Sequence, residues 1–238
     1  LETWEKFKKE INLNILSLKQ ISLFFLILLP FAIIIGQAPS DIIVSSISIL
    51  FLVNSLIQKD WSWIKTKWIR RIFFLWIYLI FASFFAFDIK TAFEHSILFV
   101  RFFIFAIALQ YWVLSNKRFL QYILYSISVA FIFVFIDTFY QFLHFDLVKG
   151  YGPDILGYYS NDHFRLTGPF RSNIPGAYLS KFFFIFFLFT IVQLKKSEKY
   201  TFLFIPLITL CFFLVFLTGE AMSFASIGLG LLILFLLE

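Results

Sequence analysis

Long apolar runs separated by short polar segments constrain the fold of this chain more than any other feature. A transmembrane helix needs about 20 consecutive, predominantly apolar residues. Eight such stretches lie at roughly 21–37, 41–57, 71–87, 96–114, 120–144, 176–194, 201–218 and 221–237. The composition, with 61% hydrophobic and only 14% charged residues, is also typical of membrane proteins. We therefore expect an all-α fold, a polytopic transmembrane helix bundle with about eight spans.

The distribution of Lys and Arg predicts the orientation of this bundle, because these residues are retained on the cytoplasmic side of a membrane. Most of them fall before the first span or in alternate loops after it. They are Lys6, Lys8, Lys9, Lys19, Lys59, Lys65, Lys67, Arg70, Arg71, Lys117, Arg118, Lys195, Lys196 and Lys199. We expect a cytoplasmic N-terminus, a cytoplasmic or interfacial amphipathic segment at 1–20 and a transmembrane domain at 21–238. Topology accounts for the net charge of +6, so no nucleic-acid partner is expected.

Three tryptophans, Trp61, Trp63 and Trp68, alternate with cations in the loop between the second and third spans. Aromatic and basic residues together are typical of a segment in the headgroup region of a bilayer. Membrane anchoring is the interpretation that we prefer for this loop. A binding site for a partner is the alternative.

Ionisable residues inside predicted spans are candidates for function, because charges are costly in the membrane and normally face a bundle interior or a wet cavity. Arg101 and Lys181 each lie within a span near the expected outer surface. Asp137, Gln141 and His144 follow an i, i+4, i+7 spacing, which predicts one polar helix face. Snorkelling of the two cations towards headgroups and interhelical hydrogen bonding by the polar face are the structural alternatives.

The longest predicted connection, about residues 145–175, lies on the expected periplasmic side and contains several glycines, prolines and polar residues. Arg165 and Arg171 belong to this loop. Together with Arg101 and Lys181, they could form one site of positive potential, because Arg and Lys both bind phosphate oxygens. The sequence therefore predicts a site for an anionic lipid headgroup or a lipid-linked diphosphate, with solvated loop arginines as the alternative.

Motifs for metal and cofactor binding are not found in the sequence. Cys211 is the single cysteine, and no His and Cys spacing for zinc, P-loop or dinucleotide-binding fingerprint is present. We expect no metal and no cofactor.

Three stretches, "FIDTFYQFLHFDLVKGYGPDILGY", "RLTGPFRSNIPGAYLSKF" and "FLTGEAMSFASIGLGLLILF", occur in this order. The region from about 95 to 238 resembles the bacterial O-antigen ligase and polymerase family of membrane glycosyltransferases. Asp137 and Gln141 match the polar helix that precedes an outer loop in this family, and Arg165 begins its R-x-x-G-x-F stretch. Glu220 matches the L-T-G-E-R turn, in which this chain has Ala221 instead of Arg.

The resemblance implies transfer of a glycan from an undecaprenyl-diphosphate carrier to an acceptor hydroxyl, on lipid A core or another glycan. The reaction would take place at the periplasmic face of the bacterial inner membrane. It would need a catalytic base, for which His163 and Asp137 are candidates beside Asp162, and cations such as Arg165 to stabilise the leaving diphosphate.

Two further hypotheses remain open at this point. The chain could be a transporter or flippase for an anionic or lipid-linked substrate, with Arg101 and Lys181 along a pathway. It could also be a non-catalytic, degenerate family member, because Ala221 replaces the usual Arg. The first residue is Leu, and the last predicted span reaches the end of the sequence, so we expect a fragment of a longer protein.

Overall fold

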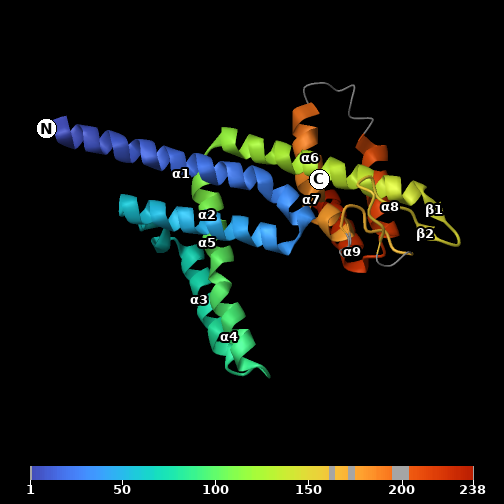
Figure 1. The fold of residues 1–238 in the computed structure, drawn as a ribbon, viewed down its shortest axis with the longest axis horizontal. Coiled ribbons are helices and arrows are strands. Elements are labelled where there is room, and N and C mark those ends of the chain that lie inside the picture. Colours follow the sequence, from blue (N-terminus) through green and yellow to red (C-terminus); the bar gives the residue numbers. More distant parts are fainter. Residues whose placement is uncertain (1, 161–163, 171–174, 195–203, 238) are drawn as a thin grey trace. The chain divides into compact units, whose positions relative to one another are not determined.

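The structure is a computed structural model that describes residues 2–160, 164–170, 175–194 and 204–237 (Figure 1). Its described part is mainly helical, as the sequence predicts. The chain divides into two compact units. Unit 1 contains residues 1–33 and 37–122, and unit 2 contains residues 34–36 and 123–238.

Unit 1 consists of helices joined by short turns. They are α1 (Glu2–Ile35), α2 (Gln37–Gln58), the 3₁₀ helix η1 (Ser62–Lys65), α3 (Lys67–Ser83), α4 (Ile89–Leu98), α5 (Val100–Ala108) and the π-helix η2 (Leu109–Leu114). The predicted amphipathic segment at 1–20 and the first predicted span form one continuous helix, α1.

Packing in unit 1 joins α2 to α5 and α3 to α4. Ile47 and Phe51 of α2 and Ile107 of α5 are almost completely buried, and the Ser48 hydroxyl donates to the carbonyl oxygen of Arg101 at 2.8 Å. Helices α3 and α4 form a hairpin in Figure 1, in which the Trp76 indole N–H donates to the Ser96 carbonyl oxygen at 2.9 Å. Aromatic burial and a few side-chain hydrogen bonds therefore hold this unit together.

Unit 2 contains most of α6 (Lys117–Leu143) and all the elements that follow. These are the strands β1 (Phe145–Asp146) and β2 (Gly150–Tyr151), followed by α7 (Pro175–Leu194), α8 (Phe204–Leu217) and α9 (Ala221–Leu237). The two strands pair antiparallel, with Phe145 opposite Tyr151. The described residues between β2 and α7 form turns and irregular structure, with no helix among them.

The core of unit 2 is rich in phenylalanine. Phe131 of α6 stacks on Phe186 of α7, with ring centroids 4.4 Å apart. Leu179 and Phe183 of α7 and Leu214 of α8 are also buried. These buried side chains hold α6, α7 and α8 together and thereby fix the position of the polar C-terminal end of α6.

Five helices in the described ranges are long and apolar enough to cross a membrane. They cover 18–35, 37–58, 89–114, 117–143 and 175–192, and they overlap five of the eight spans predicted from the sequence. Helices α3, α8 and α9 correspond to the other three predicted spans and have 17, 14 and 17 residues. The structure thus supports a protein embedded in a membrane through several apolar helices.

Candidate functional site

The C-terminal part of α6 carries a buried polar face. Asp137, Thr138 and Gln141 each have 0% exposure, which agrees with the i, i+4 spacing of Asp137 and Gln141. His144 is exposed instead, because α6 ends at Leu143 and the chain turns before the third polar position. Its imidazole lies over the ring of Tyr140, with centroids 4.2 Å apart.

Gln141 binds the backbone of the following loop at two places. Its side-chain oxygen accepts hydrogen bonds from the backbone N–H groups of Thr167 and Gly168, both at 2.9 Å. Its amide nitrogen donates to the carbonyl oxygen of Gly152 at 3.3 Å. One buried amide on α6 therefore joins two loop segments that are 15 residues apart in the sequence.

Asp137 makes a third contact of this kind, to the turn at residues 154–158. One carboxylate oxygen of Asp137 accepts the backbone N–H of Ile155 at 2.8 Å. Asp154 closes the turn by accepting the Tyr158 N–H at 2.7 Å. The second carboxylate oxygen, Oδ2, of both Asp137 and Asp154 is buried and has no hydrogen-bond partner among the described residues.

A glycine is required where the loop meets α6. Gly168 has φ +50°, in the left-handed region, and a Cβ at this position would collide with the Thr138 hydroxyl and lie 3.6 Å from Oδ2 of Asp137. We call the contacts of Asp137, Thr138 and Gln141 with residues 152, 155, 167 and 168 the α6 clasp. The α6 clasp fixes the path of the loop on both sides of residues 161–163.

Arg165 lies between the two segments that the α6 clasp holds. Its side chain is exposed, whereas Leu166, Thr167 and Phe170, which follow it, are buried. Among the described residues, Arg165 has no ion-pair partner. The neighbouring packing thus presents an exposed guanidinium group at the end of α6.

Two other ionisable groups of the same loop are poor candidates for a general base. Hydrogen bonds from the backbone N–H groups of Lys149 and Val148 hold the pKa of Asp146 below its ordinary value. Burial raises the pKa of the Tyr151 phenol, so that group stays neutral.

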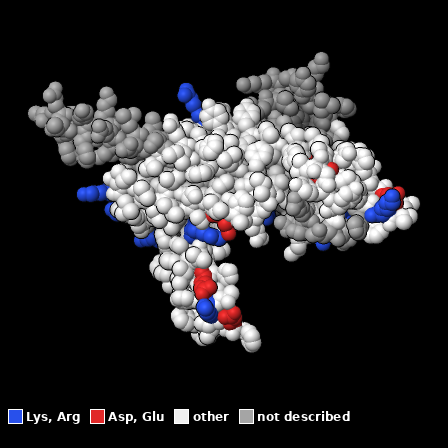
Figure 2. All heavy atoms as spheres, viewed as in Figure 1, with Lys and Arg blue, Asp and Glu red and all other residues white. Residues whose placement is uncertain are grey.

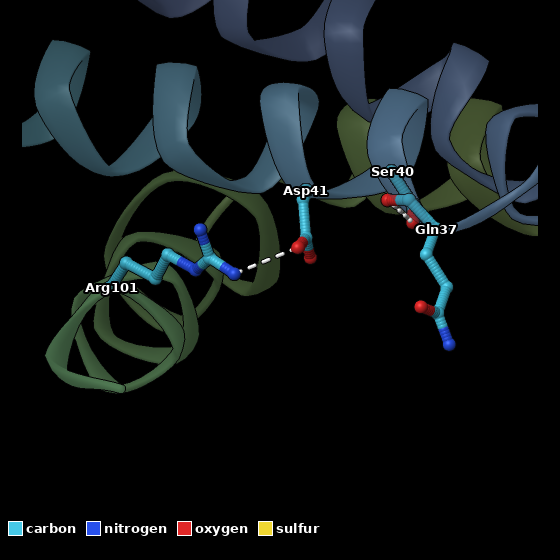
Figure 3. A network of polar contacts seen from close by, with 4 residues as sticks. All are labelled: Gln37, Ser40, Asp41 and Arg101. Carbon is cyan, nitrogen blue, oxygen red and sulfur yellow. Dashed lines mark hydrogen bonds and ion pairs between the residues drawn. The ribbon is translucent and has the colours of Figure 1, made fainter. Parts of the chain in front are cut away.

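Arg101 lies in unit 1, where its guanidinium Nη2 contacts Oδ2 of Asp41 at 2.8 Å (Figure 3). Asp41 belongs to α2 and Arg101 to α5, so the ion pair joins two helices that also contact through Ser48. The side chains of Arg101 and Asp41 are 31% and 43% exposed. The Nε of Arg101 is buried without a hydrogen-bond partner among the described residues. The charge of Arg101 is therefore compensated within its own unit.

Lys181, on the second turn of α7, is exposed. Ile185 and Leu188, which follow at helical spacing, are exposed as well. Lys181 thus extends from an exposed apolar stripe of α7, as snorkelling would require.

Glu220 lies in the turn between α8 and α9. Its carboxylate accepts a hydrogen bond from the Ser223 hydroxyl in the first turn of α9. A Cβ at Gly176, in the first turn of α7, would collide with the Thr218 hydroxyl and lie 3.3 Å from the Glu220 carboxylate. The Thr218–Glu220 turn thus packs directly against the start of α7, and a carboxylate is favourable at the positive ends of both helices.

His163 and Arg171 lie outside the described residues, so the structure gives no position for them. Among the residues that it does describe, no group of three His, Cys, Asp or Glu side chains could hold a metal ion. A cavity of about 210 Å³ is formed by apolar side chains of α6, α7 and α8, including Phe131, Phe187 and Cys211. Apart from the buried thiol of Cys211, the residues that line this cavity are all hydrocarbon or aromatic.

The sequence did not identify Asp41, Ile155 and Thr167 as partners of the predicted residues. Asp41 had a detectable signal, because it is an acid at the end of one predicted span and Arg101 is a cation in another. The partners of Asp137 and Gln141 are backbone N–H groups, which every residue except proline carries, so no sequence pattern identifies them.

Comparisons with models of protein families, with curated proteins and with solved structures give no match to this chain.

Proposed function

We propose that this protein is a membrane glycosyltransferase that transfers a glycan from an undecaprenyl-diphosphate carrier to an acceptor hydroxyl. The reaction is of the O-antigen ligase or polymerase type and takes place at the periplasmic face of the bacterial inner membrane. In this proposal the chain has eight spans and a cytoplasmic N-terminus. The acceptor is lipid A core or another glycan.

The α6 clasp is the observation that carries the proposal. It fixes the loop backbone through Gln141 and Asp137, and between the fixed segments the Arg165 guanidinium is exposed and has no ion pair among the described residues. A rigid support for a planar cation suits a phosphate ligand, because guanidinium groups form two parallel hydrogen bonds with phosphate oxygens.

The chemistry requires one bond to form and one to break. The acceptor oxygen attacks the anomeric carbon of the sugar, the bond from that carbon to the diphosphate oxygen breaks, and the diphosphate leaves with the bonding electrons. Arg165 and Arg171 stabilise the growing negative charge on the diphosphate. The proton of the acceptor hydroxyl passes to a base.

Asp137 and His163 are the two candidates for this base in the proposal. Oδ2 of Asp137 has no hydrogen-bond partner among the described residues and can accept a proton. Asp137 is also completely buried, so the loop segments at Ile155 and Gly168 that contact it would have to move for an acceptor to reach it. His163 lies outside the described residues, and its place in the proposal comes from the sequence alone.

Replacement of Arg165 tests the proposal in the full-length protein. We expect Arg165→Ala to slow the consumption of the lipid-linked glycan by roughly 100-fold or more, the usual size of such electrostatic contributions. Arg165→Lys should restore part of the rate. Lys149→Ala is the matched control, because it removes an exposed cation from the same loop. Equal rates for Arg165→Ala, Lys149→Ala and the unaltered protein would remove the proposed role of Arg165.

A transporter or flippase for an anionic or lipid-linked substrate is the second candidate function. The ion pair between Arg101 and Asp41 supports it, because paired charges within apolar helices are typical of substrate pathways. Flipping of a fluorescent lipid-linked diphosphate in reconstituted vesicles, lost in Asp41→Asn and unchanged in Arg165→Ala, would favour this candidate over the transferase.

A further inference from the structure

The connection between α2 and α3, together with the start of α3, presents a strongly basic surface in unit 1. All five cations of this region have exposed side chains, and none has an ion pair among the described residues. We call this surface the η1 basic patch; it consists of Lys59, Lys65, Lys67, Arg70 and Arg71. Figure 2 shows Lys and Arg side chains projecting from the molecule around the end of α2 and η1.

The η1 basic patch has a rigid support. Trp63, in the middle of η1, is 4% exposed, donates its indole N–H to the Ser55 hydroxyl at 3.2 Å and packs on Phe51 with ring centroids 5.6 Å apart. The hydroxyls of Thr66 and Tyr111 lie 3.2 Å apart. The segment that carries the cations is therefore fixed to α2 and η2.

Local stability does not explain why these positions are basic. Lys59 has φ +53°, a conformation for which glycine is preferred and which costs other residues energy. The first turn of α3 contains Lys67 and no acidic residue, although the helix dipole favours acids there. Lys59 and Lys67 are therefore present although the backbone conformation at residue 59 favours glycine and the helix dipole of α3 favours an acid.

The single acid of this loop does not neutralise the patch. Asp60 accepts the backbone N–H of Ser62 at 3.0 Å. Hydrogen bonds from the Ser62 side chain and backbone hold the pKa of Asp60 below its ordinary value. The η1 basic patch and Asp60 together carry one negative and five positive charges.

From these observations we infer that the η1 basic patch binds the anionic headgroups of membrane phospholipids. Two apolar side chains of the same segment, Trp61 and Ile64, are each 39% exposed and can enter the interfacial region between headgroups and acyl chains. Five exposed cations beside an exposed Trp complement the phosphate charges of an anionic leaflet, to which each basic residue near the surface adds binding energy. This inference is independent of the proposed transferase activity.

Lipid retention by the purified chain tests the inference. The chain is reconstituted in nanodiscs of phosphatidylcholine with about a quarter phosphatidylglycerol, an anionic lipid, and the lipids that remain bound are counted by native mass spectrometry. We expect the unaltered chain to retain phosphatidylglycerol in preference to phosphatidylcholine. Lys65→Gln should lower this preference about fivefold, and Lys65→Gln with Arg70→Gln should lower it further. The preference should also fall as the salt concentration rises.

Lys90→Gln is the matched control, because Lys90 is an exposed lysine of the same unit that lies outside the η1 basic patch. It should leave the preference for phosphatidylglycerol unchanged. An unaltered thermal unfolding midpoint for each variant shows that the fold is retained. The inference is wrong if the unaltered chain retains both lipids equally, or if Lys90→Gln and Lys65→Gln lower the preference by the same factor.

Discussion

The two units use polar residues inside apolar helices in different ways. In unit 1, Arg101 and Asp41 form an ion pair between two partly exposed side chains. In unit 2, Asp137 and Gln141 are completely buried and bind loop backbone. A partly exposed ion pair contributes little to stability, whereas a buried backbone N–H that loses its partner is costly. The Arg101–Asp41 pair of unit 1 thus joins two helices, whereas Asp137 and Gln141 of unit 2 determine the shape of a loop.

The largest effect is expected at the contact between Gly168 and Thr138. Gly168→Ala places a Cβ against the Thr138 hydroxyl at a positive φ, so the loop must shift or the helix must move. We expect a loss of about 3 kcal/mol in the free energy of unfolding, from overpacking and backbone strain together. Thermal or denaturant unfolding in detergent measures it.

Gly157→Ala is the control for backbone strain. Gly157 has φ +84°, and a Cβ added there would meet no described atom within 4 Å, so only the strain of about 1 kcal/mol should remain. Equal losses for the two variants would mean that Gly168 does not contact α6 closely.

Removal of the Gln141 amide should have the next largest effect. Gln141→Leu leaves the N–H groups of Thr167 and Gly168 buried without their acceptor. We expect a loss of about 2–3 kcal/mol and faster hydrogen exchange at these two amides. Gln141→Glu keeps the acceptor oxygen and should retain the slow exchange better than Gln141→Leu. Unchanged exchange in Gln141→Leu would contradict the α6 clasp.

The ion pair of unit 1 should show a smaller effect. A double-mutant cycle with Arg101→Gln and Asp41→Asn should give a coupling energy of about 0.5–1 kcal/mol, because both side chains are partly exposed. The coupling should fall as salt is added. The same cycle with Arg71→Gln and Asp41→Asn serves as a control and should give none. If the coupling energy of Arg101 and Asp41 were as large as the loss of unfolding free energy in Gln141→Leu, the polar groups of the two units would not differ in their contribution to stability.

The smallest expected effect is a pH dependence at the tip of the α3–α4 hairpin. The Asp88 carboxylate accepts the Thr91 hydroxyl and the Thr91 backbone N–H at the start of α4. These hydrogen bonds hold the pKa of Asp88 below its ordinary value. Their stabilisation is therefore complete above the pKa of Asp88 in the unfolded chain, about 3.9, and is lost as the pH falls through the lower folded value.

Asp88→Asn provides the measurement for this dependence. Exchange of the α4 amides should become faster on acidification in the unaltered chain and be less sensitive to pH in the variant. An identical acid response in both chains would assign the effect to another group.

The sequence predicted the helical fold and much of the candidate site because both leave periodic signals. Apolar runs identify α6 and α7 as long membrane helices, and the i, i+4 spacing placed Asp137 and Gln141 on one face. His144 was predicted on that face but lies beyond the helix end, because the periodicity does not mark where a helix stops. Asp41 could have been matched to Arg101 by charge, although nothing in the spacing indicates which helices pack together.

The apolar, helical character of this chain and its suitability for a membrane follow from hydropathy and helical spacing, which are properties of the local sequence. Three outcomes follow from packing in three dimensions instead: Gln141 binds Thr167 and Gly168, Asp41 compensates Arg101, and Arg165 is exposed beside the α6 clasp. These outcomes depend on contacts between residues far apart in the chain, and on which backbone groups and side chains packing brings within hydrogen-bond distance.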